Sequence, residues 1–389
     1  MTETQSPYGN LIVEFHILQS FPVTCLNRDD VGAPKTALVG GTTRARVSSQ
    51  CWKRHVRLAM KQLSTPFTYG SRTKLIKALI EKACIEAGAT EQQAENCAES
   101  VENIFIKKNE SEKNAAKNDV DGEAKETKKE KSDTLLFLSP SEVKKIAAAF
   151  KQEGFIPDKV IKQKVADKQA KEIAALIGKL NFAVDGVDIA LFGRMVAQAA
   201  SMQVEAAASF SHAISTHKVT NEVEFFSALD DESKEPGSAH IGSLEFNSAT
   251  YYRYVSLNIG QLWENMAGQN VIEAVKAFTR ALYTAIPAGR QTTQSGACWW
   301  EYARIFIRRG QRLQVPFETA VKADGGGFLS PSKKVLDTYL DKKEKLAGSL
   351  FGKVAEIPPF GDDDSFTIDA LINSITSALK TTASTKSAL

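Results

Sequence analysis

The sequence predicts an α+β protein with a ferredoxin-like or RRM-like core, into which a lobe of helices is inserted. Three observations support this fold class. A β-rich, alternating stretch lies at residues 11–18, helical patterns fill residues 70–202, and two further β-rich stretches follow between residues 208 and 259. The order of strand, helix, helical insertion, paired strands, helix and strand indicates a sheet whose chain is interrupted by a second domain.

The first strand, LIVEFHIL at 11–18, is followed by a polar loop with two adjacent glycines and then by an amphipathic helix. We expect Ser48 or Ser49 to be its N-cap, because a serine side chain accepts a hydrogen bond from a free N–H of the first turn. On this helix, one arc carries apolar side chains and a separate arc carries cations. The apolar set is Trp52, Val56, Ala59, Met60 and Leu63, and the basic set is Lys53, Arg54, Arg57 and Lys61.

The helical lobe contains a stretch of different character. Residues 107–133 hold eight lysines and eight acidic residues, with no aromatic side chain and Val120 as the one large aliphatic. Such a segment cannot bury enough apolar surface to offset the entropy lost on ordering, so we predict a disordered insertion. Helices are expected to resume after Ser139-Pro140 and to continue past Met202.

Two β-rich stretches organise the second half of the chain. Residues 208–219 and 243–259 both alternate, and the segment between them is turn-rich and polar except for Phe225, Phe226 and Leu229. This predicts a strand pair with a long excursion. Helices are then expected at 270–285, 317–323 and 332–346, a strand at 300–308, and a frayed end at 384–389.

Composition excludes several classes of protein. Hydrophobic residues make up 43% and charged residues 24% of the 389, which are ordinary globular values. No apolar run approaches the roughly 20 residues that span a bilayer, and no signal peptide is apparent, so we expect no membrane association. The five cysteines are scattered without a Cys-x-x-Cys pair, which favours a reduced, cytoplasmic setting.

Positive charge is concentrated near the N-terminus. Formal net charge is only +3, yet residues 28–57 hold seven Lys or Arg against two aspartates. A local excess of this kind suits a polyanion, although a solvated surface explains many such clusters equally well. Ser48, Ser49 and Gln50 add hydrogen-bond donors that contact phosphate or sugar oxygens without selecting a base.

Catalytic signatures are sparse. Asp29 and Asp30 are carboxylates of the kind that hold Mg²⁺ for phosphodiester cleavage. His212, His217 and His240 lack the spacing of zinc ligands, and no P-loop, GxSxG or Rossmann motif is present. We therefore expect no catalytic residue, no metal and no cofactor.

Several blocks together resemble one family. CLNRDD (25–30), GG (40–41) and RVSSQ (46–50) are followed by GVDIALFGRM (186–195), SHAISTHKV (211–219), FFSALDD (225–231), GSAHIGSLEFNSATYYRY (237–254) and IPAGRQ (286–291). In this order they resemble the CasC backbone subunit of the type I-E CRISPR Cascade complex, a RAMP family. The chain departs from the family pattern in the 107–133 insertion, in Phe225 where Trp is expected, and in Ser227 where Thr is common.

The resemblance implies an arrangement like a right hand that polymerises along a CRISPR RNA. The palm would comprise residues 1–66 and 208–348, the helical fingers 67–207, the thumb hairpin 217–243, and a C-terminal extension 349–389. The implied partners are the CRISPR RNA, further copies of the chain, other Cascade subunits, and target DNA through guide pairing. The protein would hold phosphates and kink nucleotides at intervals, leaving the remaining bases free to pair.

Residue roles follow from the same resemblance. Lys35, Ser48, Gln50, Lys53 and Arg57 match backbone-contacting positions of the palm, and Met195 matches a wedge beside the kinked base. Phe225, Phe226 and Ser227 match thumb positions at the displaced nucleotide, where aromatic rings suit base stacking. Weaker RNA-binding candidates are Arg28, Arg44, Arg46, Ser49, Arg54, Arg194, Arg290 and Gln291. Without the resemblance, Met195 and the two phenylalanines would be assigned to hydrophobic cores, and Arg28 and Arg194 equally to ion pairs.

Two alternatives remain open at this point. Backbone subunits of type III complexes cleave target RNA with a loop aspartate, a role open to Asp29 or Asp30. A free-standing single-stranded RNA-binding protein would share the basic palm but would not need a protruding hairpin.

Overall fold

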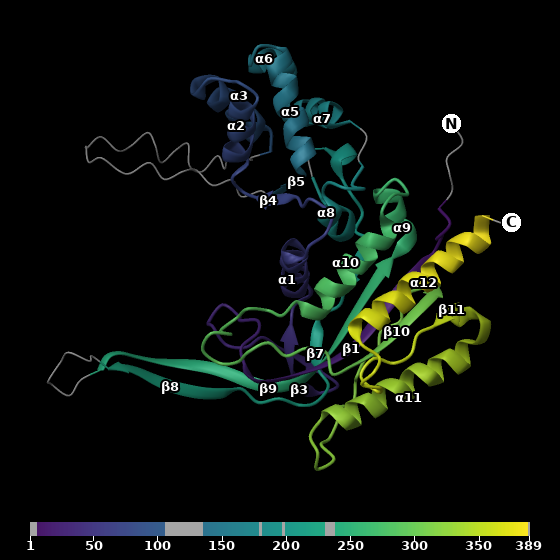
Figure 1. Cartoon of the computed structure of the whole chain (residues 1–389). Helices are drawn as coiled ribbons and strands as arrows, with labels where there is room; N and C mark the ends of the chain where they lie inside the picture. Colours follow the sequence, from purple (N-terminus) through teal and green to yellow (C-terminus); the bar gives the residue numbers. More distant parts are fainter. Residues whose placement is uncertain (1–5, 106–134, 179–180, 197–198, 230–237, 388–389) are drawn as a thin grey trace. The chain divides into compact units, whose positions relative to one another are not determined.

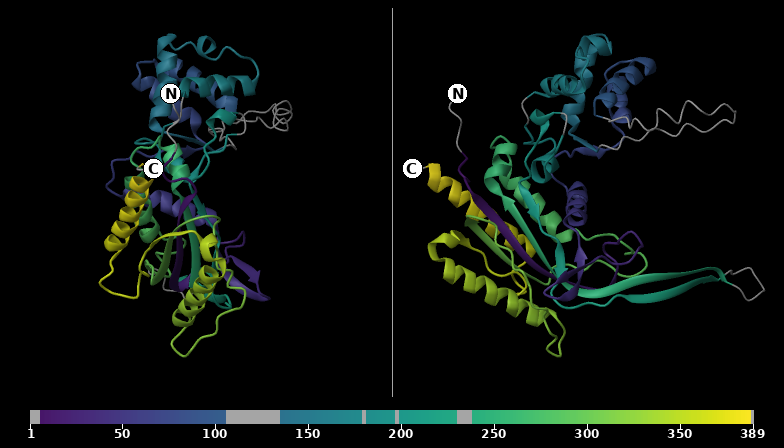
Figure 2. Two further views of the ribbon diagram at one scale, coloured as in Figure 1. Left: turned by 90° about the vertical axis from the view of Figure 1, so that its right-hand side faces the viewer. Right: turned by 180° about the vertical axis from the view of Figure 1, so that it is seen from behind.

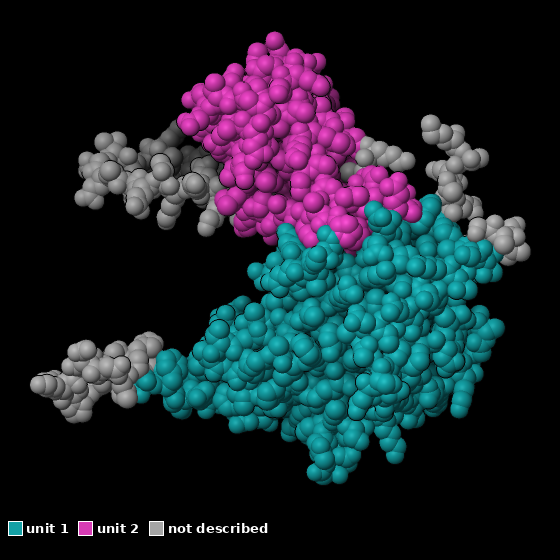
Figure 3. All heavy atoms as spheres, viewed as in Figure 1, with its two compact units in different colours: residues 1–65, 207–263, 270–389 teal, residues 66–206, 264–269 magenta. Residues whose placement is uncertain are grey.

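The computed structural model describes residues 6–105, 135–178, 181–196, 199–229 and 238–387, and the predicted insertion at 107–133 lies outside these ranges. The chain forms two compact units (Figure 3). Unit 1 comprises Met1–Thr65, Ala207–Trp263 and Asn270–Leu389, and unit 2 comprises Pro66–Ala206 and Glu264–Gln269. In the described ranges, no helix is both long enough and apolar enough to cross a membrane.

Unit 1 is built on a nine-stranded antiparallel sheet (Figure 1). Its main path runs β11 (Lys353–Glu356), β10 (Tyr302–Arg309), β1 (Leu11–Thr24), β9 (Ser238–Asn258), β7 (Ala213–Ser215), β3 (Thr42–Val47) and β2 (Thr36–Val39). The short strand β6 (Ala208–Phe210) and the strand β8 (Glu222–Leu229) each pair with β9. The α+β prediction is confirmed.

Strand β1 lies at the centre because its side chains are buried on both faces of the sheet. One face packs Leu18 and Phe306 against Leu336 of helix α11 (Leu329–Ala347). The opposite face is covered by α1 (Ser49–Gln62) and α10 (Val271–Thr284), and α12 (Ile368–Ser387) packs against α10 (Figure 2).

Helix α1 follows its sequence pattern. Ser48 is the N-cap, and its hydroxyl accepts a hydrogen bond of 3.2 Å from the backbone N–H of Cys51. Trp52, Val56 and Met60 are buried, as the apolar arc predicts. The basic arc is consequently turned away from the sheet.

Strands β8 and the outer half of β9 form a hairpin, which we call the thumb hairpin (222–229 and 238–246). Its ladder runs from Glu222 opposite Phe246 to Leu229 opposite Ser238. Strand β9 continues without a break from the hairpin into the centre of the sheet, and the hairpin extends beyond the rest of unit 1 (Figure 1).

Unit 2 is mostly helical. Its elements are β4 (Ser71–Thr73), α2 (Ile76–Glu86), α3 (Glu91–Phe105), β5 (Leu136–Leu138), α5 (Pro140–Gln152), α6 (Pro157–Val160), α7 (Ala166–Ile177), α8 (Val187–Phe192) and η2 (Ala200–Met202). Ser139 and Glu142 form a capping box at the start of α5. Ile80, Val101 and Phe150 are fully buried in its core. Helix α9 (Ile259–Asn265) crosses the boundary between the units.

Several predicted elements differ from the structure. Residues 208–219 hold two short strands rather than one, and residues 193–196 are not helical. The helix predicted at 317–323 is absent, because the carbonyls of Phe317 and Glu318 accept hydrogen bonds from the guanidinium of Arg44. The end predicted to fray is helical as far as Ser387, and β11, within the predicted C-terminal extension, joins the main sheet by pairing with β10.

Candidate nucleic-acid interface

The loop before β2 is fixed to the start of α1 by backbone hydrogen bonds. The N–H of Lys35 donates to the carbonyl of Asn27 at 2.8 Å, and its own carbonyl accepts from the N–H of Arg46 at 2.8 Å. The Asn27 side chain accepts from the N–H of Ser48 at 2.9 Å. The half-buried Lys35 therefore lies on a loop that is fixed beside the N-terminus of α1, the positive end of the helix dipole, which favours an anion.

The basic arc of α1 combines exposed and half-buried cations. Gln50 and Arg54 are exposed, whereas Lys53 and Arg57 are half-buried. Burial, followed by the positive charge of Arg312, lowers the pKa of Lys53. Its Nζ lies 5.9 Å from the ring centroid of Phe210. An anion placed here would favour the charged lysine and offset both effects.

Polar neighbours orient the first turn of α1. The Ser49 hydroxyl donates to Oε1 of Gln50 at 3.2 Å, and the Ser49 N–H donates to Nδ1 of His212 at 3.2 Å. At the middle of the helix, Nε2 of His55 accepts a 3.2 Å hydrogen bond from the N–H of Ala288. The loop after α10 is thereby attached to α1.

Two of the weaker candidates are wrong as nucleic-acid contacts, because their guanidinium groups are buried and hold protein atoms. Arg44 is 0% exposed and donates to the carbonyls of Ser215, Thr216, Phe317 and Glu318 at 2.9 to 3.1 Å. Arg194 is 5% exposed and forms an ion pair of 2.8 Å with Glu142 in unit 2. For Arg194 the ion-pair alternative is therefore correct.

The other weaker candidates lie at the surface. Arg28 and Arg54 are exposed, and Nε of Arg46 donates to the carbonyl of Thr36 at 3.3 Å. Arg290 has a left-handed φ of 52°, and its carbonyl accepts from the N–H groups of Thr293 and Gln294. Gln291 is half-buried in the same turn.

This turn holds a third polar side chain, which was not among the residues expected from the sequence. Both amide atoms of Gln294 and the Nε atom of Arg290 are buried without a hydrogen-bond partner in the described part of the chain. Buried polar atoms nearly always form hydrogen bonds in folded proteins. A bound ligand or water molecule would supply the hydrogen-bond partners that these atoms lack. Nothing in the run QTTQ distinguishes Gln294 from an ordinary surface glutamine.

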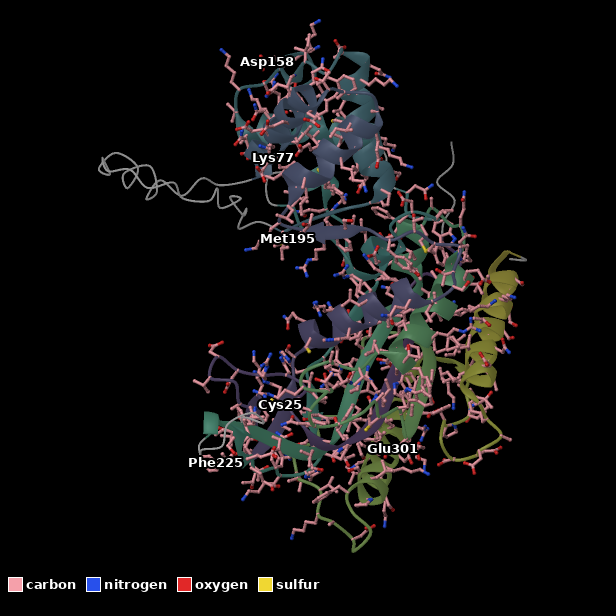
Figure 4. All side chains as sticks on the ribbon, turned by 60° about the vertical axis from the view of Figure 1, so that its left-hand side comes forward. Cys25, Lys77, Asp158, Met195, Phe225 and Glu301 are labelled. Carbon is pink, nitrogen blue, oxygen red and sulfur yellow. The ribbon has the colours of Figure 1, made fainter. Side chains whose placement is uncertain are left out.

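The thumb hairpin exposes its aromatic residues unequally, and Figure 4 labels the more exposed one, Phe225. Phe225 is 78% exposed and Phe226 is 37% exposed, and the two point to opposite faces of the ribbon. The Phe226 ring lies across its cross-strand partner Gly242, where a Cβ atom would come within 2.6 Å of Cζ. Ser227 is exposed on the Phe225 face. The core interpretation is therefore wrong for Phe225.

Met195 is 84% exposed in unit 2 and does not belong to a core (Figure 4). Its neighbour Arg194 fixes the backbone there, because the Arg194 N–H donates to Val204 and its guanidinium donates to Met202, Phe137 and Glu142. An apolar side chain is thus presented to solvent from a rigid position.

The carboxylate of Asp29 accepts hydrogen bonds from the backbone of the loop that follows it. Its Oδ1 accepts from the N–H of Val31 at 3.1 Å and from that of Ala33 at 2.9 Å. An open pocket is lined by residues 26–32 together with His55 and Gly289. Among the described residues, no three His, Cys, Asp or Glu side chains gather as metal ligands.

The candidate histidines have structural partners. His212 accepts from Ser49, and Nε2 of His217 accepts from the N–H of Thr250 at 3.1 Å. The His217 ring stacks on Phe328 with a centroid distance of 3.6 Å. The side chain of His240 lies outside the described part.

Comparison with known proteins finds solved structures with the same fold and one matching family. A solved chain titled "CRISPR RNA-guided surveillance complex, pre-nicking" superposes with a TM-score of 0.73 at 26% identity, covering 94% of this chain and 99% of that one. A second, titled "CRISPR RNA-guided surveillance complex", shares the fold with a TM-score of 0.63 at 24% identity, over 94% and 99% of the two chains. No curated protein matches the sequence. The model of the family described as CT1975-like protein (Cas_CT1975) matches residues 13–356, and the chain belongs to that family.

Proposed function

We propose that the protein is an RNA-binding backbone subunit of a CRISPR surveillance complex of the type I-E kind. One observation carries the proposal: Lys35, Ser48, Gln50 and Lys53 gather at the start of α1, with Arg57 one turn further on, in a protein whose family and similar structures belong to CRISPR systems. Copies of the chain would assemble along one CRISPR RNA with other subunits, in the cytoplasm.

The chemistry of these side chains suits a backbone subunit that binds guide RNAs of any sequence. Cations and hydroxyls bind phosphate and sugar, which leaves the base edges free for pairing with target DNA. The exposed rings of the thumb hairpin and the exposed Met195 supply apolar surfaces for displaced nucleotides. Contact of the thumb hairpin and of Met195 with displaced nucleotides is part of this proposal.

We assign no catalytic activity to the chain. In the type III-like alternative, Asp29 or Asp30 would hold a metal ion for RNA cleavage. Against it, Oδ1 of Asp29 already accepts two backbone hydrogen bonds that shape the loop. A free-standing RNA-binding protein is disfavoured by the thumb hairpin, which extends beyond the rest of unit 1 (Figure 1) and which such a protein would not need.

The salt dependence of RNA binding tests the proposal. Replacing Lys35, Lys53 and Arg57 together by alanine should weaken binding of a mixed-sequence single-stranded RNA. It should also reduce the log–log salt slope by about 2, at about 0.7 per lost phosphate contact. The matched control removes three exposed lysines of α11, Lys334, Lys342 and Lys345, which changes net charge equally. Equal slopes in the two triple variants would remove the α1 surface from the interface.

A further inference from the structure

Arg253 is buried in unit 1 without an acidic partner. It lies on β9 opposite Ile17 of β1, is 2% exposed, and donates through Nη1 to Oε1 of Gln19 at 2.5 Å. Its Nε and Nη2 atoms have no hydrogen-bond partner within the described residues. Arg308 and Arg194 are buried too, but they are paired with Glu14 and Glu142. The buried Arg44 has no acidic partner either, but it donates to four backbone carbonyls.

The main contact of this guanidinium is the indole of Trp52 on α1. Cζ of Arg253 lies 3.5 Å from the ring centroid, and Trp52 is 1% exposed. Burial lowers the pKa of Arg253 to about 9, and no neighbouring charge is among the causes of this shift. The group therefore remains a cation at neutral pH. A cation stacked on an aromatic face is attracted most strongly when both groups are removed from water.

The stack lies under the part of α1 that carries the proposed contacts. Trp52 is in the first turn of the helix, adjacent to Lys53 and four residues after the N-cap Ser48. Arg253 is itself fixed, because Gln19, which accepts from it, donates through Nε2 to the carbonyl of Cys298 at 2.5 Å. A chain of contacts thus runs from the sheet to the first turn of α1.

We propose that Arg253 is a positioning residue for RNA-backbone binding, which holds the first turn of α1 in place through its stack on Trp52. The inference rests on the proposed function, because it requires that α1 binds RNA. Arg253 itself does not touch the RNA. It fixes the place from which Ser48, Gln50 and Lys53 reach the phosphates, and an arginine is suited to this because its planar group stacks on an indole as a lysine ammonium does not.

A double-mutant cycle on the full chain tests this role. The probe is a short, fluorescently labelled single-stranded RNA of mixed sequence, titrated well below the melting temperature of every variant. Arg253→Met should lower RNA affinity by up to about tenfold, because losing the buried cation–π contact lets the first turn of α1 leave its binding position. In a Lys53→Ala/Arg57→Ala background the same substitution should have a clearly smaller effect, because Lys53, the cation among the groups that it positions, is gone.

Matched tryptophan variants provide a second readout, useful if Arg253→Met does not fold. Trp52→Phe weakens the stack, whereas Trp300→Phe alters another buried indole, which packs against Phe15 and Phe360. No arginine among the described residues stacks on Trp300. Both should lower the melting temperature, but only Trp52→Phe should lower RNA affinity.

The outcomes separate the inference from the proposed function. If Arg253→Met lowers affinity equally in both backgrounds, or if Trp300→Phe lowers affinity as much as Trp52→Phe, Arg253 has a general structural role and the inference is overturned. If Lys53→Ala/Arg57→Ala itself leaves RNA affinity unchanged, the α1 surface is not the RNA site and the proposed function loses its main support.

Discussion

Truncating Phe225 should barely change the stability of the isolated chain while disturbing its assembly on RNA. A phenylalanine buries about 150–250 Å² when fully enclosed, and Phe225 is 78% exposed, so it buries roughly 45 Å². At about 25 cal/mol per Å², Phe225→Ala costs about 1 kcal/mol, which corresponds to about 2–4 °C in melting temperature for a unit of this size. Phe278, on α10, is 0% exposed, and Phe278→Ala should cost about 3–5 kcal/mol.

Thermal unfolding of the two variants without RNA gives the first comparison, and nuclease protection of a guide RNA in the assembled complex gives the second. We expect Phe225→Ala to melt close to the parent chain and to give irregular protection, because the displaced nucleotide loses its stacking surface. Binding of complementary DNA should weaken as well. A melting temperature lowered as far as in Phe278→Ala would show that Phe225 is a core residue, and regular protection would show that it has no role at the RNA.

Three further predictions follow from buried or constrained groups. An assembled complex incubated with complementary RNA and Mg²⁺ should show no cleavage, and periodic cleavage lost in Asp29→Ala or Asp30→Ala would establish the type III-like alternative. Arg194→Met leaves Glu142 buried without its partner and should destabilise unit 2 by about 3–5 kcal/mol, whereas the double change with Glu142→Leu should recover much of this in thermal unfolding. Burial lowers the pKa of His16 to about 3, so the unfolded chain takes up the proton first as pH falls. Stability should therefore decline below about pH 6.5, by about 2 kcal/mol at pH 5, and His16→Gln should flatten that decline in chemical denaturation.

Local pattern was sufficient for the elements that carry the site. The spacing of Trp52, Val56 and Met60 predicted both the buried face of α1 and the outward direction of its cations, because a helix has a fixed period. The same stretch offered Ser48 or Ser49 as the N-cap, and the structure has Ser48. These features depend on residues within a few turns of one another.

Features that depend on contacts between residues far apart in the chain could not be predicted from local sequence pattern. Arg44 stands among the cations of residues 28–57, and its burial depends on carbonyls contributed by Ser215 and Phe317 far along the chain. The same hydrogen bonds explain why residues 317–323 do not form the helix that their pattern favours. A backbone carbonyl that accepts a hydrogen bond from a guanidinium group is less available to accept one within a helix. The stack of Arg253 on Trp52 likewise joins residues some two hundred positions apart.

Strand β9 runs for 21 residues from the thumb hairpin into the middle of the sheet, with a register shift against β8 at its outer end. A single residue inserted near Gly242 would turn every outer side chain of the strand to the opposite face, whereas two residues would preserve their faces. The reach of the hairpin is consequently adjustable only in paired steps, each adding about 7 Å when both strands lengthen together. Among relatives of this protein, hairpin length should therefore vary by even numbers of residues per strand. Any spacing along a bound polymer that the hairpin sets would change in discrete increments rather than continuously.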